Sequence, residues 1–229
     1  MNASHRPPRG VAAIRDANES AFAVILQQLN AALPGAYASA FIDEEGECIE
    51  YAGAVDPYHI KVAGARLRIV LAALDDTRAL GTVHTLVVRA ARESMTVQRV
   101  LDQYALVVLF SRGGGFTRAS RAFAVAQRQI TEECGMKYTG ERWYPAQLTF
   151  DARGKPQQWL CEVDGTTRAE PVEIVGSVMG LARGERGFRL RTNDGEELMA
   201  IREASRVWYT DSRASRLSTP PPARRSIAP

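Results

Sequence analysis

One segment, Tyr104–Phe110 (YALVVLF), restricts the fold of this chain more than any other. A strand with one face in water alternates apolar and polar side chains, whereas an unbroken apolar run is typical of a central strand covered on both faces. We therefore predict a sheet in which this strand is central, with other elements packed on both of its sides.

The segments around this strand alternate between helical and extended patterns. Helices are predicted at Asn18–Leu33, Asp56–Leu80 and Thr117–Cys134, and strands at Ala36–Ile42, Glu47–Tyr51, Thr82–Ala90, Ser94–Leu101 and Tyr104–Phe110. The first helix ends at Pro34-Gly35, a pair that favours a turn. Residues 14–135 are thus predicted to form one α/β (α+β) sandwich with the order α-β-β-α-β-β-β-α.

Residues 141–211 have a different pattern, with short segments of alternating apolar and polar residues. They are predicted to follow a short linker, 136–140. Alternating segments lie at Tyr144–Phe150, Gln158–Val163, Val172–Leu181, Gly187–Thr192, Glu197–Arg202 and Val207–Thr210. Turn sequences such as Asn193-Asp194-Gly195 separate them, so a small all-β module is expected, an OB-like or similar small barrel. All three tryptophans (Trp143, Trp159, Trp208) fall here, and we interpret them as core residues of a small module.

The chain has a net charge of +3, but this charge is unevenly distributed. Residues 14–135 hold 12 basic and 14 acidic side chains, and residues 141–211 hold 10 and 12. The basic excess lies in Lys137 and in the ends, 1–13 and 212–229, which are polar, proline-containing and predicted to be disordered. A general nucleic-acid binder concentrates basic charge on a folded face, so the charge balance gives that function little support.

The helix predicted after Asp56, its N-cap, and Pro57, at the first helical position, carries apolar residues on two opposite faces. One face holds Ile60, Leu67, Leu71 and Leu74, and the other holds Tyr58, Val62, Ala65 and Ile69. A helix that covers a sheet needs only one apolar face. The second face must contact either another part of the chain, such as the β module, or a partner. Gly64 and Ala65 are small enough to permit close approach of another helix.

These features together resemble the Roadblock / dynein light chain family, of the bacterial small-GTPase-regulator type. The matching segments are FAVILQQLNAALPGAYASAFIDEEGECI, DPYHIKVAGARLRIVLAAL, TVHTLVV and YALVVLF, before a glycine turn and a final helix. The resemblance covers residues 16–135 and does not extend to the β module.

The resemblance implies a homodimer formed through the second helix and the following strand, which extends the sheet across both subunits. It also implies a Ras-like small GTPase, or a related signalling or motility protein, as the partner of a non-catalytic adaptor or regulator. On this chain the implied interface comprises Tyr58, Val62, Ala65, Arg66, Ile69, Val83, Thr85 and Val87. Arg66 and Arg68 flank the second face and are interpreted as solvated charges.

Other functions are predicted to be absent. Cys48, Cys134 and Cys161 form no metal-binding spacing, no catalytic motif is present, and no cofactor or metal is expected. The glycine turn at Gly113-Gly114-Gly115 lacks the lysine of a phosphate-binding loop. His84 is interpreted as a packed strand residue. With no signal peptide or apolar span, the protein is expected to be cytoplasmic, without a membrane partner.

The alternative function is single-stranded nucleic-acid binding by an OB-like module. Phe188 and Leu190 would lie on one face of their strand, and Arg189 and Arg191 on the other.

Overall fold

The computed structural model describes residues 20–77, 81–101, 103–112, 120–163 and 166–212. The ends predicted to be disordered lie outside these residues, apart from Ser212. The glycine turn at Gly113–Gly115 also lies outside them.

The first domain consists of three helices and a five-stranded sheet. Its elements are α1 (Ala21–Ala32), β1 (Ala36–Ile42), β2 (Cys48–Gly53), α2 (Pro57–Asp75), β3 (Thr85–Arg89), β4 (Glu93–Val100), β5 (Tyr104–Ser111) and α3 (Ser120–Glu133). The strands are all antiparallel to their neighbours, in the spatial order β2-β1-β5-β4-β3. β5 is therefore central, and β3 is an edge strand.

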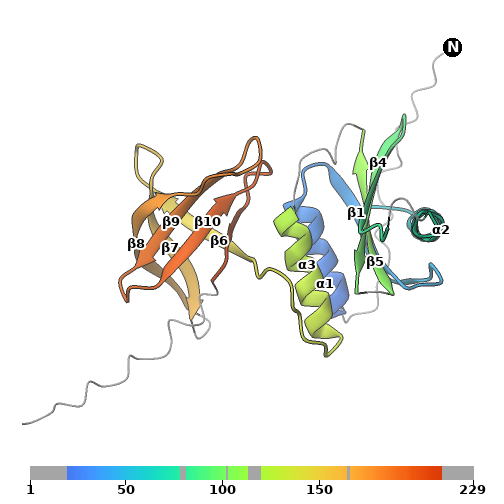
Figure 1. The fold of residues 1–229 in the computed structure, drawn as a ribbon, viewed down its shortest axis with the longest axis horizontal. Coiled ribbons are helices and arrows are strands. Elements are labelled where there is room, and N and C mark those ends of the chain that lie inside the picture. Colours follow the sequence, from blue (N-terminus) through green and yellow to red (C-terminus); the bar gives the residue numbers. More distant parts are fainter. Residues whose placement is uncertain (1–19, 78–80, 102, 113–119, 164–165, 213–229) are drawn as a thin grey trace, which may run out of the picture.

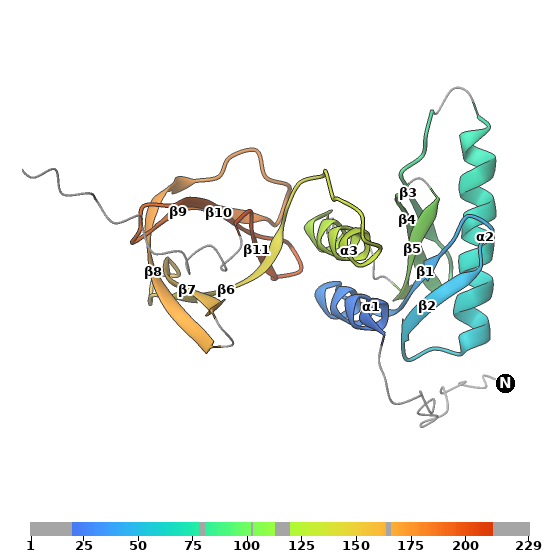
Figure 2. The same ribbon diagram turned by 90° about the horizontal axis from the view of Figure 1, so that it is seen from below.

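The apolar run of β5 is buried on both faces, as its sequence predicts. Leu106 and Val108 join a core cluster with residues of α1 and α3. Val107 and Leu109 join a second cluster with residues of α2. Figure 2 shows the resulting three layers, with α1 and α3 on one side of the sheet and α2 on the other.

The predicted N-terminus of α2 is confirmed, but its predicted C-terminus is wrong. The Asp56 carboxylate accepts a hydrogen bond from the Tyr58 backbone N–H, and Pro57 begins the helix. The helix ends at Asp75, not Leu80, because the Asp75 side chain accepts a hydrogen bond from the Val83 backbone N–H and thereby fixes a reversal of the chain. The following strand consequently begins at Thr85 rather than at Thr82.

The second domain is a closed six-stranded barrel. Its strands are β6 (Tyr144–Phe150), β7 (Pro156–Val163), β8 (Thr166–Ser177), β9 (Arg186–Thr192), β10 (Glu197–Arg202) and β11 (Trp208–Thr210). Each strand pairs with its neighbours in sequence, and β11 closes the barrel against β6. The predicted small barrel is present, but the OB-like topology is wrong, because an OB-fold is a five-stranded Greek key and this barrel is a meander.

The barrel packs against α1 and α3 (Figure 1). Trp143, Ile201 and Tyr209 belong to the same buried cluster as the apolar residues of those two helices. Trp143 therefore fills the boundary between the domains rather than the barrel interior, whereas Trp159 is buried inside the barrel.

Charged side chains also hold this boundary. The Arg121 backbone N–H, in the first turn of α3, donates a 2.7 Å hydrogen bond to Glu203 Oε1 of the barrel. The Arg121 guanidinium lies 2.8 Å from Glu185 Oε1 and 3.5 Å from Glu203 Oε1, and it stacks on the Trp143 ring. The barrel thus covers the α1/α3 side of the first domain, so one predicted possibility, that it covers the second face of α2, is wrong.

Candidate protein-binding surface

The second apolar face of α2 points away from the sheet. We call Tyr58, Val62, Ala65 and Ile69 the outer stripe. Tyr58 and Ile69 are 75% and 67% exposed, while Val62 and Ala65 are half-buried. On the opposite face, Ile60, Leu67 and Leu71 are buried against the sheet. The two faces therefore have the separate environments that the helical spacing predicts.

Small residues of α2 serve packing within the chain. A Cβ built on Gly64 would lie 3.1 Å from the Ile42 side chain, so Gly64 faces the sheet and not the outer stripe. A Cβ built on Gly46, in the β1–β2 turn, would lie 3.0 Å from the Ala65 Cα. The small side chains thus permit close packing of α2 on β1 and on the β1–β2 turn.

The predicted interface residues around β3 do not share one face with the outer stripe. Val83 precedes the strand, is half-buried and packs against the core cluster of the α2 side. Leu86 packs against the core cluster of the α2 side, so Thr85 and Val87, which alternate with it, point to the opposite face of the sheet. β3 pairs with β4 alone and so leaves an open backbone edge, whereas α2 contacts β1, β2 and β5.

Sequence reasoning missed several apolar residues on the α2 side of this edge. Val70 is 43% exposed, and Leu86, Val88 and Met95 are only partly buried. Val70 lies on the helical flank that carries His59 and Arg66, so the polar side chains around it mask it in the helical pattern. The period-2 pattern of β3 could have identified Leu86 and Val88 as the residues facing α2.

A polar cluster lies at the N-terminal end of α2. The Tyr37 hydroxyl donates a 2.5 Å hydrogen bond to Glu93 Oε2, and His59 Nε2 lies 3.2 Å from the same oxygen. Burial and the adjacent carboxylate raise the pKa of Tyr37, so its hydroxyl stays protonated and remains a donor. This cluster joins β1, β4 and α2 and fixes the helix beside the open edge. Arg66 is exposed near the outer stripe.

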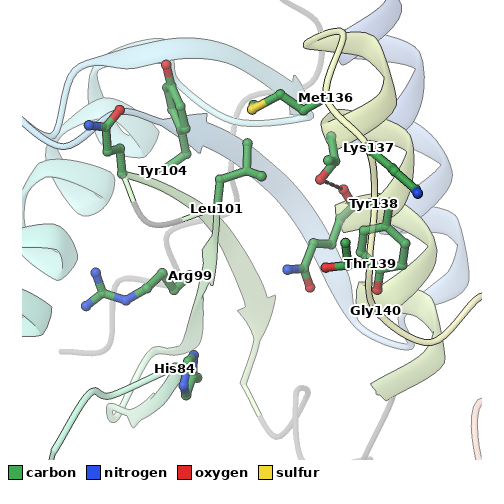
Figure 3. Close-up of a pocket in the computed structure, with 12 residues that line it drawn as sticks. His84, Arg99, Leu101, Tyr104, Met136, Lys137, Tyr138, Thr139 and Gly140 are labelled. Atoms are coloured by element: carbon green, nitrogen blue, oxygen red, sulfur yellow. Dashed lines mark hydrogen bonds between the residues drawn. The ribbon is translucent and has the colours of Figure 1, made fainter.

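A cavity of about 650 Å³ opens beside the C-terminal end of α3. Figure 3 shows His84 and Arg99 on the sheet side and the segment from Met136 to Gly140 on the helix side. The interpretation of His84 as a packed strand residue is wrong, because His84 precedes β3 and its exposed side chain lines this cavity. The Arg99 guanidinium is held by Asp75 and by the Val83 carbonyl, so it connects β4 to the end of α2.

Catalytic and metal-binding clusters receive no support from the described residues. In the parts of the chain that the structure describes, no group of three His, Cys, Asp or Glu side chains could hold a metal ion. Burial raises the pKa of the Cys48, Cys134 and Cys161 thiols, which disfavours the reactive thiolate. No helix among the described residues is long and apolar enough to cross a membrane.

The basic strand face predicted for nucleic-acid binding is neutralised. Arg189 and Arg191 do lie opposite the buried Phe188 and Leu190. Arg189 Nη2 is 3.0 Å from Glu197 Oε2, and Arg191 Nη2 is 2.7 Å from Glu197 Oε1. Arg191 Nη1 also lies 3.8 Å from Glu173 Oε2, so two carboxylates face the two arginines and little positive charge remains on that face for phosphate groups.

No family model matches the chain, and a search of curated proteins also found no match. Solved structures of Roadblock type are similar to half of the chain. A Roadblock/LC7 domain from Streptomyces avermitilis is 14% identical, with a TM-score of 0.45, and covers 50% of this chain and 98% of that one. Myxococcus xanthus MglB is 17% identical, with a TM-score of 0.44 and coverage of 50% and 94%. MglC from Myxococcus xanthus is 20% identical, with a TM-score of 0.39 and coverage of 50% and 99%. The family named from the sequence is thus among the similar folds.

Proposed function

We propose that this chain is a non-catalytic homodimeric adaptor or regulator that binds a Ras-like small GTPase, or a related signalling or motility protein. One observation carries the proposal: Tyr58 and Ile69, two apolar residues of the outer stripe of α2, are exposed, and β3 leaves an open sheet edge in the same domain. The barrel occupies the opposite side of the domain, so a partner that needs a large apolar surface has the α2 side available.

The geometry supports a second copy of the chain as the first occupant. An open edge strand favours pairing with another strand, and two copies of β3 would continue the sheet while exposed apolar residues of α2 become buried. This arrangement would satisfy backbone groups of β3 and remove Tyr58 and Ile69 from water. The GTPase would then bind a surface that borders or spans both copies.

The GTPase proposal is tested by mixing the purified chain with Ras-like GTPases loaded with GDP or with a non-hydrolysable GTP analogue, followed by size-exclusion chromatography. We expect a complex with one nucleotide state and its loss in the Ile69→Asp variant. The matched control is Val24→Asp, which places the same charge at a partly exposed valine of α1. Equal binding by both variants would show that the outer stripe is not the docking surface.

A second measurement asks how a GTPase would be regulated. If GTP hydrolysis accelerates, the Arg66→Ala variant distinguishes an inserted arginine from ordering of the GTPase's own groups. We expect Arg66→Ala to retain most of the acceleration, in agreement with its interpretation as a solvated charge. A loss of about 10³-fold or more would instead identify Arg66 as a residue that acts on the transition state.

A further inference from the structure

Basic side chains of the barrel gather at one of its two ends. In an antiparallel meander alternate turns lie at the same end, so the β6–β7, β8–β9 and β10–β11 turns come together. We call this end, with residues 151–155, 178–186 and 202–207, the turn end. It contains six basic residues: Arg153, Lys155, Arg183, Arg186, Arg202 and Arg206. The slightly acidic total charge of the module conceals this concentration.

The acidic groups at the turn end are engaged in contacts of their own, one within its turn and two at the boundary with α3. Asp151 Oδ1 accepts hydrogen bonds from the backbone N–H groups of Arg153 and Lys155. Glu185 and Glu203 contact Arg121 of α3. Within the described residues, no ion pair joins any of the six basic side chains to a carboxylate. The turn end therefore keeps its positive charge.

Aromatic rings lie among these cations. The Phe150 and Trp208 ring centroids are 5.4 Å apart, and Trp208 stacks on Phe188 with centroids 6.0 Å apart. Phe150 is 39% exposed, so the outer ring of this stack reaches solvent. The Arg186 guanidinium lies 4.8 Å from the Phe188 centroid.

Two of the arginines extend this aromatic stack toward the turns. Arg186 shares the strand face of Phe188, and a Cβ built on Gly154 would lie 3.9 Å from Arg186 Nη1, so this side chain also borders the β6–β7 turn. Arg202 lies opposite both Arg186 and Trp208 in the strand pairing. Its Nε atom is buried and has no hydrogen-bond partner in the described part of the chain. Cations, ring faces and an unsatisfied donor thus converge at one end of the barrel.

We propose that the turn end of the barrel is a binding site for single-stranded nucleic acid. Unpaired cations attract the phosphates, and an exposed ring provides a face on which a base stacks, the combination used by proteins that bind single strands without base readout. The site is distinct from Arg189 and Arg191 on the outside of β9, and it does not depend on the function proposed for α2. A membrane surface is a less suitable ligand, because Phe188 and Trp208 pack in the barrel core and of these three rings only Phe150 is exposed.

The test uses the full chain and a fluorescein-labelled oligothymidine of about 12 nucleotides, a length within the usual site size, with fluorescence anisotropy as the readout. We expect binding at low salt that weakens as salt increases. The Lys155→Gln/Arg186→Gln variant should reduce the slope of log K against log salt by about 0.7 for each lost phosphate contact. The matched control, Arg189→Gln/Arg191→Gln, removes two arginines from the outside of β9 and should change neither affinity nor slope.

Stacking is tested with Phe150→Ala, whose folding is checked by thermal melting. We expect it to weaken binding at least about fivefold, and an abasic oligomer of the same length should bind less tightly than oligothymidine. The proposal is overturned if oligothymidine does not bind at low salt, or if the control variant loses as much affinity as the Lys155/Arg186 variant. It is also overturned if the abasic oligomer binds as tightly as oligothymidine. A further contradicting result is that vesicles of anionic phospholipid displace oligothymidine and the Phe150→Ala variant binds oligothymidine as tightly as the wild type.

Discussion

Replacement of Arg121 by methionine should destabilise the contact between the two domains more than any surface substitution. Arg121 faces two carboxylates, Glu185 and Glu203, whose side chains are 5% and 0% exposed. Methionine keeps the apolar part of the side chain over Trp143 but removes the guanidinium that, among the described residues, contacts this pair. Because the loss of one partner leaves buried charge uncompensated, we expect the free energy of unfolding to fall by about 3–5 kcal/mol.

The matched control is Arg189→Met, which breaks an ion pair whose side chains are 55% and 40% exposed. Exposed pairs contribute about 0–1 kcal/mol, so the control should change stability little. Urea denaturation followed by tryptophan fluorescence measures both variants, because Trp143 lies at the domain boundary. If Arg121→Met costs no more than Arg189→Met, the buried ion pairs do not hold the domains together.

The same boundary should respond to pH through Glu203. Burial and the neighbouring Glu185 raise the pKa of Glu203, although Arg121 opposes this shift. Because its folded-state pKa is raised, protonated Glu203 stabilises the folded protein. This contribution is fully present below the unfolded pKa, about 4.3, and is lost as pH rises through the folded pKa. Glu203→Gln keeps an oxygen that can accept the Arg121 backbone N–H and should flatten this part of the stability–pH curve. A curve with the same slope in both proteins would refute the assignment.

Two further substitutions test the first domain. Gly53→Ala should lower the free energy of unfolding by about 1–3 kcal/mol, because Gly53 has φ +121° and an added Cβ would lie 2.2 Å from the Tyr37 carbonyl oxygen. Thermal melting measures this loss, and an unchanged melting temperature would contradict the assigned backbone conformation. The Val83 N–H and Arg99 lower the pKa of Asp75, so the stability that ionised Asp75 contributes is lost as pH falls through its folded-state pKa. Asp75→Asn should therefore flatten the acid end of the stability–pH curve, which acid titration followed by circular dichroism measures.

Local sequence features predicted the elements of the first domain well. The Asp56-Pro57 pair set the start of α2, and the unbroken run Tyr104–Phe110 identified the central strand. Helix caps and hydrophobic patterns depend on residues that are close in the chain, so the sequence alone is enough to identify them. The end of α2 was misplaced because it depends on the contact between Asp75 and Val83 across a chain reversal.

The arrangement of the domains could not be predicted in the same way. Arg121 and Glu203 are separated by 82 positions in the sequence. Neither residue has a local pattern that marks it as buried, since charged residues are usually exposed. The gathering of basic side chains at one end of the barrel was hidden for a related reason. A net charge sums over all residues, whereas the meander decides which turns, and therefore which arginines, share an end.

The exposure of Tyr58 and Ile69 agrees with the outer apolar face predicted for α2, whereas the predicted interface residues around β3 are divided between the two faces of the sheet. The family resemblance implies an interface that contains both Val87 and Ile69, but the alternation within β3 places the Val87 side chain on the other face of the sheet. Val83, Leu86 and Val88 are on the α2 side. We therefore expect side-chain contacts between two copies to involve α2 and Leu86, with Thr85 contributing through the strand backbone.

Sedimentation velocity on the wild-type chain and on the Val62→Asp/Ile69→Asp variant tests the central claim most directly. Burial of two uncompensated carboxylates in the interface would cost several kcal/mol, so the wild type should sediment as a dimer and the variant as a folded monomer. Val24→Asp, the control on α1, should remain dimeric. A monomeric wild type, or a variant that remains dimeric at the same concentration, would contradict the assignment of the α2 face as the self-association surface.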